Sequence, residues 1–245
     1  RYDEQVKQGL KDQLDELAAD LRKRTKATVS TAVLAGPITT TLAEYAARRG
    51  VELVVMTTHG RGGISRLWLG STAEGLVRRI ALPVLLLRPT EHGAPVDVSF
   101  RRILVPLDGS GFGEEAVPLA VRLAGTKDVE YVLTQVIPAV PVVLSAATPD
   151  HDRKVFEARE TVASDYLDTQ VREARGRGAT ARGEVLSHEH VATAINEYSD
   201  AEDVDLIAMV THGRGEMSRL LFGSVAVKLI RSSQVPVLLS RPTGK

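Results

Sequence analysis

Short apolar runs alternate with amphipathic stretches along most of the chain, which predicts strands and helices in turn. Runs rich in branched aliphatic residues occupy 51–56, 103–108, 129–137 and 204–209. Such runs are typical of strands that are buried on both faces of a parallel sheet. Residues Tyr2 to Arg24 place four leucines at helical spacing along one face and therefore predict a helix. The alternation as a whole predicts an α/β fold, a parallel sheet with helices on both faces.

Between these runs, weaker patterns predict further helices, a strand, a loop and a turn. Residues 27–36 are predicted as a strand with its turn, and 39–48, 114–125 and about 153–175 as helices. Residues 138–152 hold three prolines and are predicted as a long loop. The glycine-rich stretch Gly176 to Gly183 precedes a strand instead of following one, so it is predicted as a turn.

The chain contains an internal repeat. Residues Val51 to Pro89 and Val204 to Pro242 are nearly the same, and aligning His59 with His212 gives an offset of 212 − 59 = 153. Such self-similarity predicts two homologous domains. We place the first domain at 1–90, a linker with glycine and proline at 91–99, and the second domain at 100–245.

The two copies are unequal at their beginnings. The second starts near Phe100 with a strand, a helix and a further strand, and these have no counterpart in the first copy because the repeat offset places Arg1 opposite Lys154. The first domain is thus truncated at its start in the sequence given. Because a doubly wound domain without its first strand would leave a large apolar gap, we expect a segment to precede residue 1.

The amino-acid composition excludes or disfavours several classes of partner and site. Lys+Arg and Asp+Glu both number 31, and 4% of the residues are aromatic, so neither charge nor stacking platforms favour nucleic acid. The absence of cysteine excludes disulfides, thiolate catalysis and thiolate metal sites. No signal peptide or membrane-length apolar run is visible, so we expect a cytoplasmic protein without a membrane partner.

The loop that follows the strand at 204–209 contains residues suited to binding an anion. His212 and Gly213 leave its carboxyl end, and nine residues later Gly223 and Ser224 open a helix. Ser224 is predicted as the N-cap, and the amides of such a helix end attract phosphate. Glycine lets an anion approach the backbone. The alternative is that both glycines serve tight turns. The imidazoles of His59 and His212 either donate to a phosphate or orient their loops.

Asp108 ends the strand at 103–108 and lies at the same predicted edge of the sheet. A carboxylate there can hold a divalent cation against phosphates or accept a hydrogen bond from a ribose. The alternative is that Asp108 caps the following helix. The turn Gly109 to Gly113 has the spacing G-x-G-x-G, which is not that of a dinucleotide fingerprint.

Three motifs together resemble the universal stress protein family in its tandem two-domain form: ILVPLDGS, the sequence T-H-G-x9-G-S, and the closing x-P-V-L-L-x-R-P. The resemblance implies two tandem Rossmann-like domains, each a five-stranded parallel sheet of order 3-2-1-4-5. It also implies that the domains pair through their last strands. That pairing would bury two apolar edges of the kind that PVLLLRP and PVLLSRP would expose. Further association into a homodimer stays open.

One branch of that family binds ATP. In the second copy the resemblance assigns adenosine and Mg²⁺ to Pro106, Leu107 and Asp108, the adenine pocket to Val136 and Met209, and the phosphates to Gly213, Gly223, Ser224 and Val225. Asp108 is then the metal ligand. The matching residues of the first copy are Met56, Gly60, Gly70, Ser71 and Thr72, and the loop histidines His59 and His212 complete the candidate nucleotide site.

We therefore predict a regulatory stress-response protein that binds ATP or a related adenine nucleotide with Mg²⁺. No positioned base or arginine finger is identifiable, so no enzyme beyond slow ATP turnover is predicted. The alternative is a nucleotide-free interaction module acting through edge strands and dimerisation. The family's leading glycine is replaced by Val210 in the second copy and by Thr57 in the first, and both replacements favour that alternative.

Overall fold

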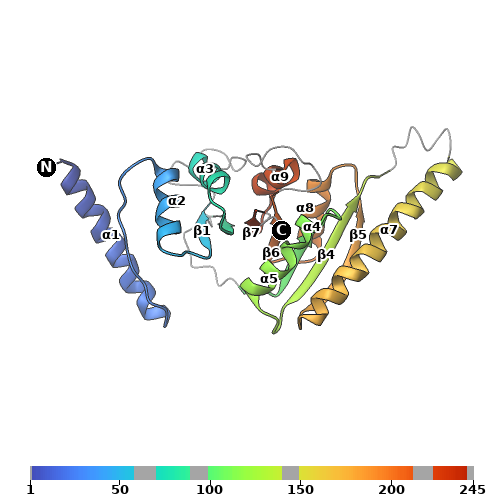
Figure 1. Cartoon of the computed structure of the whole chain (residues 1–245), viewed down its shortest axis with the longest axis horizontal. Coiled ribbons are helices and arrows are strands. Elements are labelled where there is room, and N and C mark those ends of the chain that lie inside the picture. Colours follow the sequence, from blue (N-terminus) through green and yellow to red (C-terminus); the bar gives the residue numbers. More distant parts are fainter. Residues whose placement is uncertain (1, 58–69, 89–98, 140–148, 212–222, 242–245) are drawn as a thin grey trace. The chain divides into compact units, whose positions relative to one another are not determined.

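The computed structural model describes residues 2–57, 70–88, 99–139, 149–211 and 223–241 (Figure 1). By its internal contacts the chain divides into two compact units, Arg1–Gly50 and Val51–Lys245. The first unit holds helices α1 (Tyr2–Arg24) and α2 (Ile38–Arg48). The elements of the second unit are β1 (Val54–Thr57), α3 (Ser71–Arg79), β2 (Val84–Leu87), β3 (Arg102–Pro106), α4 (Gly111–Glu114), α5 (Ala116–Ala124), β4 (Glu130–Ile137), α7 (Pro149–Gly176), β5 (Thr180–Ser187), α8 (Val191–Ala201), β6 (Leu206–Val210), α9 (Ser224–Ser232) and β7 (Val237–Ser240).

The second unit is built on a seven-stranded sheet of order β1-β2-β7-β6-β3-β4-β5. The strands of the second copy, counted within that copy, follow the order 3-2-1-4-5, and neighbouring strands among them are parallel. The strand order reverses at β3, which has β4 on one side and β6 on the other. In open α/β sheets, ligands bind beyond the carboxyl ends of the strands at such a reversal.

Helices cover the sheet of the second copy on both faces. Side chains of β3 and β4 such as Val105 and Leu133 form one buried cluster with Val117 of α5 and Leu167 of α7. The side chains that alternate with these along the strands, including Leu104 with no exposed surface, are buried as well. Because successive side chains on a strand point to opposite faces, both faces are covered, as the continuous apolar runs predicted.

The last strands of the two copies lie side by side. β2 pairs with β7 in antiparallel fashion, with Val84 opposite Leu239 and Leu86 opposite Val237. Arg88, just beyond β2, adds a hydrogen bond of 2.6 Å from its guanidinium to the carbonyl oxygen of Arg231 at the end of α9. This joint is the pairing of last strands that the family resemblance implies, and it covers an apolar edge of each strand.

The predicted strand at 27–36 is wrong, since residues 27–35 follow helix α1 without regular structure. At the equivalent place of the second copy, β5 is held by β4 over eight residue pairs. The given sequence has no counterpart of β4 before residue 27, so no neighbouring strand satisfies the backbone amides there.

Two further boundaries differ from prediction. Helix α7 begins at Pro149, so the last residues of the predicted loop at 138–152 are helical. The predicted turn at 176–183 ends early because β5 begins at Thr180. Gly183 therefore lies within a strand, where an added Cβ would lie 3.1 Å from the Cβ of Leu167. Glycine here permits close packing of α7 on the sheet, a role that a turn prediction misses.

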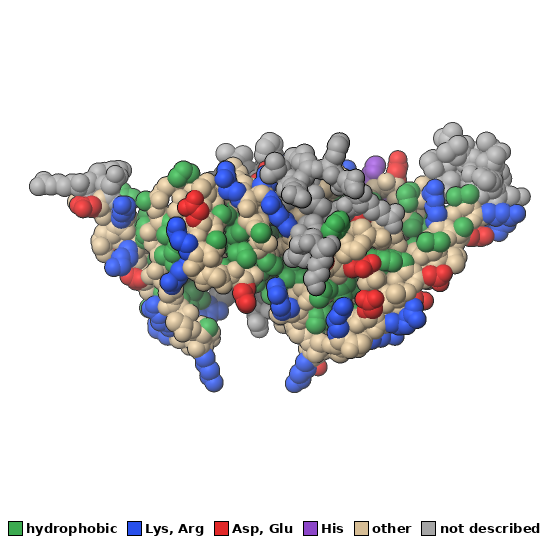
Figure 2. Space-filling view, viewed as in Figure 1, with side chains coloured by type: hydrophobic (Ala, Val, Ile, Leu, Met, Phe, Trp, Pro, Cys, Tyr) green, Lys and Arg blue, Asp and Glu red, His purple; other side chains and the backbone are tan. Residues whose placement is uncertain are grey.

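Charges of both signs are interspersed on the face drawn in Figure 2, in keeping with the equal numbers of acidic and basic residues. Within the described ranges, every helix falls short of the length and apolar character that crossing a bilayer requires.

Candidate functional site

Asp108 follows β3 and is fixed by the turn that comes after it. Its Oδ1 accepts hydrogen bonds from the backbone amide of Ser110 at 3.0 Å and from the Ser110 hydroxyl at 2.5 Å. The Ser110 Oγ in turn accepts from the amide of Gly113 at 3.2 Å and caps helix α4. The cap is therefore Ser110, while Asp108 holds Ser110 in place. The carboxylate is thus positioned at the strand end before any ligand arrives.

Gly113 explains the spacing of the glycine-rich turn. A Cβ added there would lie 2.7 Å from Oδ1 of Asp108, closer than nonbonded atoms approach. Glycine at this position is thus required for the close approach of helix α4 to the Asp108 carboxylate. The turn is built around a carboxylate, in agreement with the rejection of a dinucleotide fingerprint.

A cavity of about 660 Å³ opens beyond the carboxyl ends of β3 and β4. The structure brings to it five of the residues assigned from sequence: Pro106, Leu107, Asp108, Val136 and Val225. They come from the end of β3, from β4 and from the first turn of α9, elements far apart in the sequence. Its volume is within the range of sites that enclose drug-sized ligands.

Much of the wall was not predicted. Helix α7 contributes Val155, Ala158, Arg159, Val162 and Ala163, and the remaining residues are Gln135, Ile137, Pro138, Val191 and Ile195. The α7 residues recur at intervals of three and four, so they form one stripe of the helix. That spacing was present in the sequence. It identifies a helix face but does not say which other element that face contacts.

The two residues that flank the predicted loop at 212–222 are joined by a hydrogen bond. The amide of Gly223 donates to the carbonyl oxygen of Thr211 at 2.8 Å, and an added Cβ on Gly223 would lie 3.0 Å from that oxygen. Gly223 therefore has a structural reason to be glycine, independent of any ligand. His212 and Gly213, like His59 and Gly60 of the first copy, lie outside the described residues.

Ser224 is not the N-cap of helix α9, contrary to the prediction. Gly223 occupies that position with extended backbone angles of −57° and 143°, and Ser224 is already the first helical residue. A capping side chain belongs to the residue just before the helix, where the backbone angles are not helical. The exposed Ser224 hydroxyl lies instead at the amino end of the helix.

Met209 and Val210 end β6 and are both 7% exposed. Val210 belongs to the buried cluster that contains Leu107 and Leu133. Neither Met209 nor Val210 is among the described residues that line the cavity. The valine that replaces the family's leading glycine thus packs into the core in this structure.

In the first copy the assigned residues follow the same local pattern. Met56 lies half-buried in β1, and Gly70 precedes α3 with angles of −59° and 143°, nearly those of Gly223. Ser71 is exposed as the first residue of α3, and Thr72 after it is half-buried. Thr57 ends β1. The part of the first copy that would correspond to Asp108 lies outside the given sequence.

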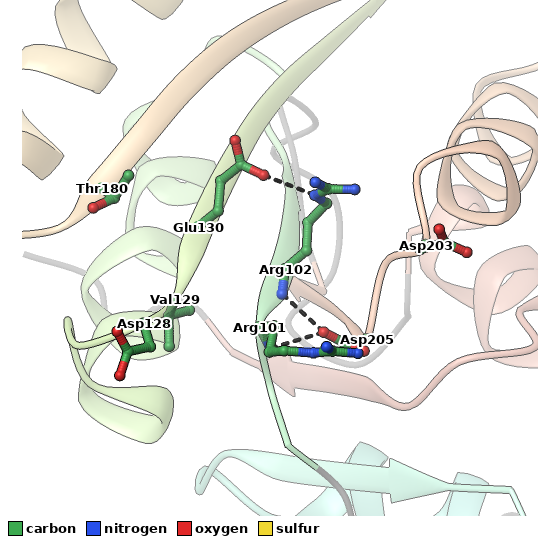
Figure 3. Close-up of a pocket in the computed structure, with 8 residues that line it drawn as sticks. All are labelled: Arg101, Arg102, Asp128, Val129, Glu130, Thr180, Asp203 and Asp205. Atoms are coloured by element: carbon green, nitrogen blue, oxygen red, sulfur yellow. Dashed lines mark hydrogen bonds and ion pairs between the residues drawn. The ribbon is translucent and has the colours of Figure 1, made fainter.

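A second cavity, of about 480 Å³, lies at the opposite edge of the sheet, where β3, β4 and β5 begin (Figure 3). Several of its charged groups are joined in one network. The Arg102 guanidinium donates to Glu130 at 2.7 Å, and Asp205 Oδ2 accepts from the backbone amides of Arg101 and Arg102 at 2.8 Å. Arg182 donates to the other oxygen of Glu130 at 3.1 Å.

The hydrogen bond from Arg102, reinforced by Arg182 and opposed by burial, lowers the pKa of Glu130. The described part of the chain contains no group of three or more potential metal-ligating His, Asp or Glu side chains, in this cavity or elsewhere. The network ties the beginnings of β3, β4 and β5 together, which gives these charges a structural role.

Comparison with known proteins agrees with this architecture. A universal stress protein of Archaeoglobus fulgidus superposes with a TM-score of 0.68 at 20% identity, covering 98% of this chain and 79% of the other. A protein of Pseudomonas aeruginosa superposes with a TM-score of 0.69 at 16% identity, covering 95% of this chain and 78% of its own. At such low identity these matches show a shared fold.

Sequence relatives point the same way. A universal stress protein of Mycobacterium tuberculosis is 27% identical over 196 residues, which is 78% of this chain and 62% of that protein. One of Mycolicibacterium smegmatis is 26% identical over 238 residues, 94% of this chain and 75% of its own length. The chain thus spans less than two thirds of the first of these relatives. The sequence model of the universal stress protein family matches residues 1–88 and again 99–241, so the chain belongs to this family.

Proposed function

We propose that the second domain binds ATP or a related adenine nucleotide in the cavity at Asp108, as the ligand of a cytoplasmic stress-response regulator. The observation that carries this proposal is the gathering of Pro106, Leu107, Asp108, Val136 and Val225 around one cavity beyond β3 and β4. Family membership supports the role in stress response. Binding would act by favouring one conformation of the protein over another.

The lining suits the parts of a nucleotide. The aliphatic side chains Val136, Ile137 and Val155 offer apolar surface for a flat base, and Asp108 can accept a hydrogen bond from a ribose hydroxyl. Arg159 supplies a positive charge in the wall. Val225 lies in the first turn of α9, whose amino-terminal amides favour a phosphate. Apolar and charged ends are thus both present around one space.

Mg²⁺ fits the site as a companion of the nucleotide. Asp108 is the one carboxylate among the described residues of the cavity wall, too few for a site made by protein alone. Mg²⁺ in nucleotide sites takes one or two carboxylates and completes its coordination with phosphate oxygens and water. When bound it would screen phosphate charge. Asp108, held by Ser110, would supply the protein ligand.

The competing function is an interaction module without nucleotide. The contact between Gly223 and the Thr211 carbonyl favours it, because it accounts for that glycine by packing alone. Within the chain the edges of β2 and β7 already pair with each other, so a partner strand would have to add at another edge. Homodimer formation through other surfaces would belong to this function.

The test is equilibrium binding of Mg-ATP to the whole chain by isothermal titration calorimetry. The repeat provides a matched pair of variants, Val225→Trp in the second copy and its equivalent Thr72→Trp in the first. Tryptophan at 225 fills the cavity and should weaken binding at least tenfold. Tryptophan at 72 should leave second-domain binding unchanged.

A further variant tests the same cavity at an exposed position, where tryptophan should not disturb the fold. Val162 is 69% exposed on α7 and lines the same cavity, so Val162→Trp should fold and still reduce affinity. Urea unfolding of each variant checks stability. Absence of binding at millimolar Mg-ATP, or equal affinity in all variants, would overturn the proposal and favour the interaction module.

A further inference from the structure

The cavity wall contains an amide whose oxygen has no partner. Gln135 lies in β4 and lines the cavity, and its Oε1 is shielded from water and accepts no hydrogen bond from the described residues. Buried side-chain oxygens are nearly always hydrogen-bonded, so an orphan beside a cavity is a candidate acceptor for water or for a group that arrives with a ligand.

The position of Gln135 in the strand determines where its amide acts. Leu133 and Tyr131, two and four residues earlier in β4, belong to the buried cluster that includes Leu167 of α7. Strand alternation puts Gln135 on the same face. Residues of α7 line the cavity on that side, including Val162 and Ala163. The amide therefore shares a cavity wall with aliphatic side chains, and a ligand that displaces water there would strengthen a hydrogen bond to it.

We propose that Gln135 is the residue that selects the base, by accepting a hydrogen bond from the exocyclic amino group of adenine. This inference rests on the proposed function. A glutamine amide presents an acceptor beside a donor, which matches the amino group of adenine and the ring nitrogen next to it. An aliphatic wall alone discriminates weakly between purines of the same shape, whereas a positioned polar group rejects the analogue that leaves it unpaired.

Neighbouring Thr134 provides the matched control. Its Oγ1 is also buried and without a partner in the described part of the chain, but the residue does not belong to the cavity wall. Substituting either residue by an apolar one of similar shape removes one orphan polar atom. A general effect of such atoms on the fold would appear in both variants, and a role in reading the base would appear in one.

The experiment compares two probes, Mg-ATP and the Mg complex of purine riboside 5′-triphosphate, which lacks the amino group. The unsubstituted chain should bind Mg-ATP about tenfold more tightly, as the loss of one desolvated hydrogen bond predicts. In Gln135→Leu the ratio should fall to about one while the analogue binds as before. In Thr134→Val the ratio should stay near ten.

The outcomes separate the two claims. Binding of Mg-ATP with the same preference in Gln135→Leu, or equal binding of both probes by the unsubstituted chain, would overturn the role of Gln135 alone. Failure to bind either probe would overturn the nucleotide proposal together with this one. Urea midpoints check the fold, and Gln135→Leu should be at least as stable as the parent because an unpaired amide leaves an apolar wall.

Discussion

Helices α1 and α7 hold the same place in the two copies of the repeat and differ in what covers their inner faces. In α7, the residues Ala163, Leu167, Gln170 and Ala174 are at most 7% exposed. Their equivalents in α1, at the offset of 153, are leucines, of which Leu10, Leu17 and Leu21 are between 39% and 56% exposed. The helix with the more apolar face is thus the less buried one. A helical pattern predicts the helix, but burial depends on the sheet that receives it.

The strands show the same contrast. β6 is buried throughout because β3 and β7 flank it, whereas in the described residues β1 pairs with β2 alone. Val55 of β1 is 53% exposed, and its equivalent Ala208 is fully buried. The carboxylate turn, with Arg102 and Glu130 of the charge network, also belongs to the part of the repeat that only the second copy contains within the given sequence. Each of these features gives a way to test the comparison.

The largest expected effect is at the helix faces. Leu167→Ala should lower the free energy of unfolding by about 2–5 kcal/mol, because it leaves a cavity where α7 packs on β4 and β5. The equivalent Leu14→Ala in α1 should cost about 1 kcal/mol or less, since Leu14 is only half-buried. Urea unfolding of both variants measures the difference. Equal losses would show that α1 is packed as firmly as α7.

The strand-end turn should give the next largest effect. Gly113→Ala places a Cβ against Asp108 and should cost about 1–3 kcal/mol, with weaker Mg-ATP binding if Asp108 holds the ligand. Gly111→Ala, two residues away, meets no atom within 4 Å and should be nearly neutral. Thermal unfolding and calorimetry measure the two effects. A neutral Gly113→Ala would contradict the close packing around Asp108.

The charge network should give the smallest effect, and one that depends on pH. Because the pKa of Glu130 is lowered in the folded protein, its stabilisation is present above the unfolded pKa and lost as the pH falls through the folded value. Glu130→Gln should therefore cost about 1 kcal/mol at pH 7 and less at pH 3. Glu157→Gln, in an exposed pair with Arg153, is the control. A loss that is independent of pH would exclude the ionic cause.

Much of the second domain could be predicted from its sequence, because its strands are continuous apolar runs and Asp108 ends one of them. The site at Asp108, Val136 and Val225 could be assembled only through the family resemblance, since their nearness depends on strand order. The contribution of α7 to the cavity wall was not predicted, because residue spacing identifies one face of a helix but not the element that this face contacts. The strand predicted at 27–36 failed for a related reason: a strand needs a partner, and propensity does not supply one.

The antiparallel joint between β2 and β7 also determines how two ligands would influence each other. β1 is parallel to β2 and β6 to β7, so the chain leaves β1 and β6 at opposite edges of the joined sheet. A ligand bound beyond the end of β1 and one bound beyond the end of β6 would not touch, and their two sites would have no residue in common. Allosteric coupling between them would have to pass through the protein, along the strands and across the joint, where three paired positions and the hydrogen bond from Arg88 to Arg231 connect the two copies.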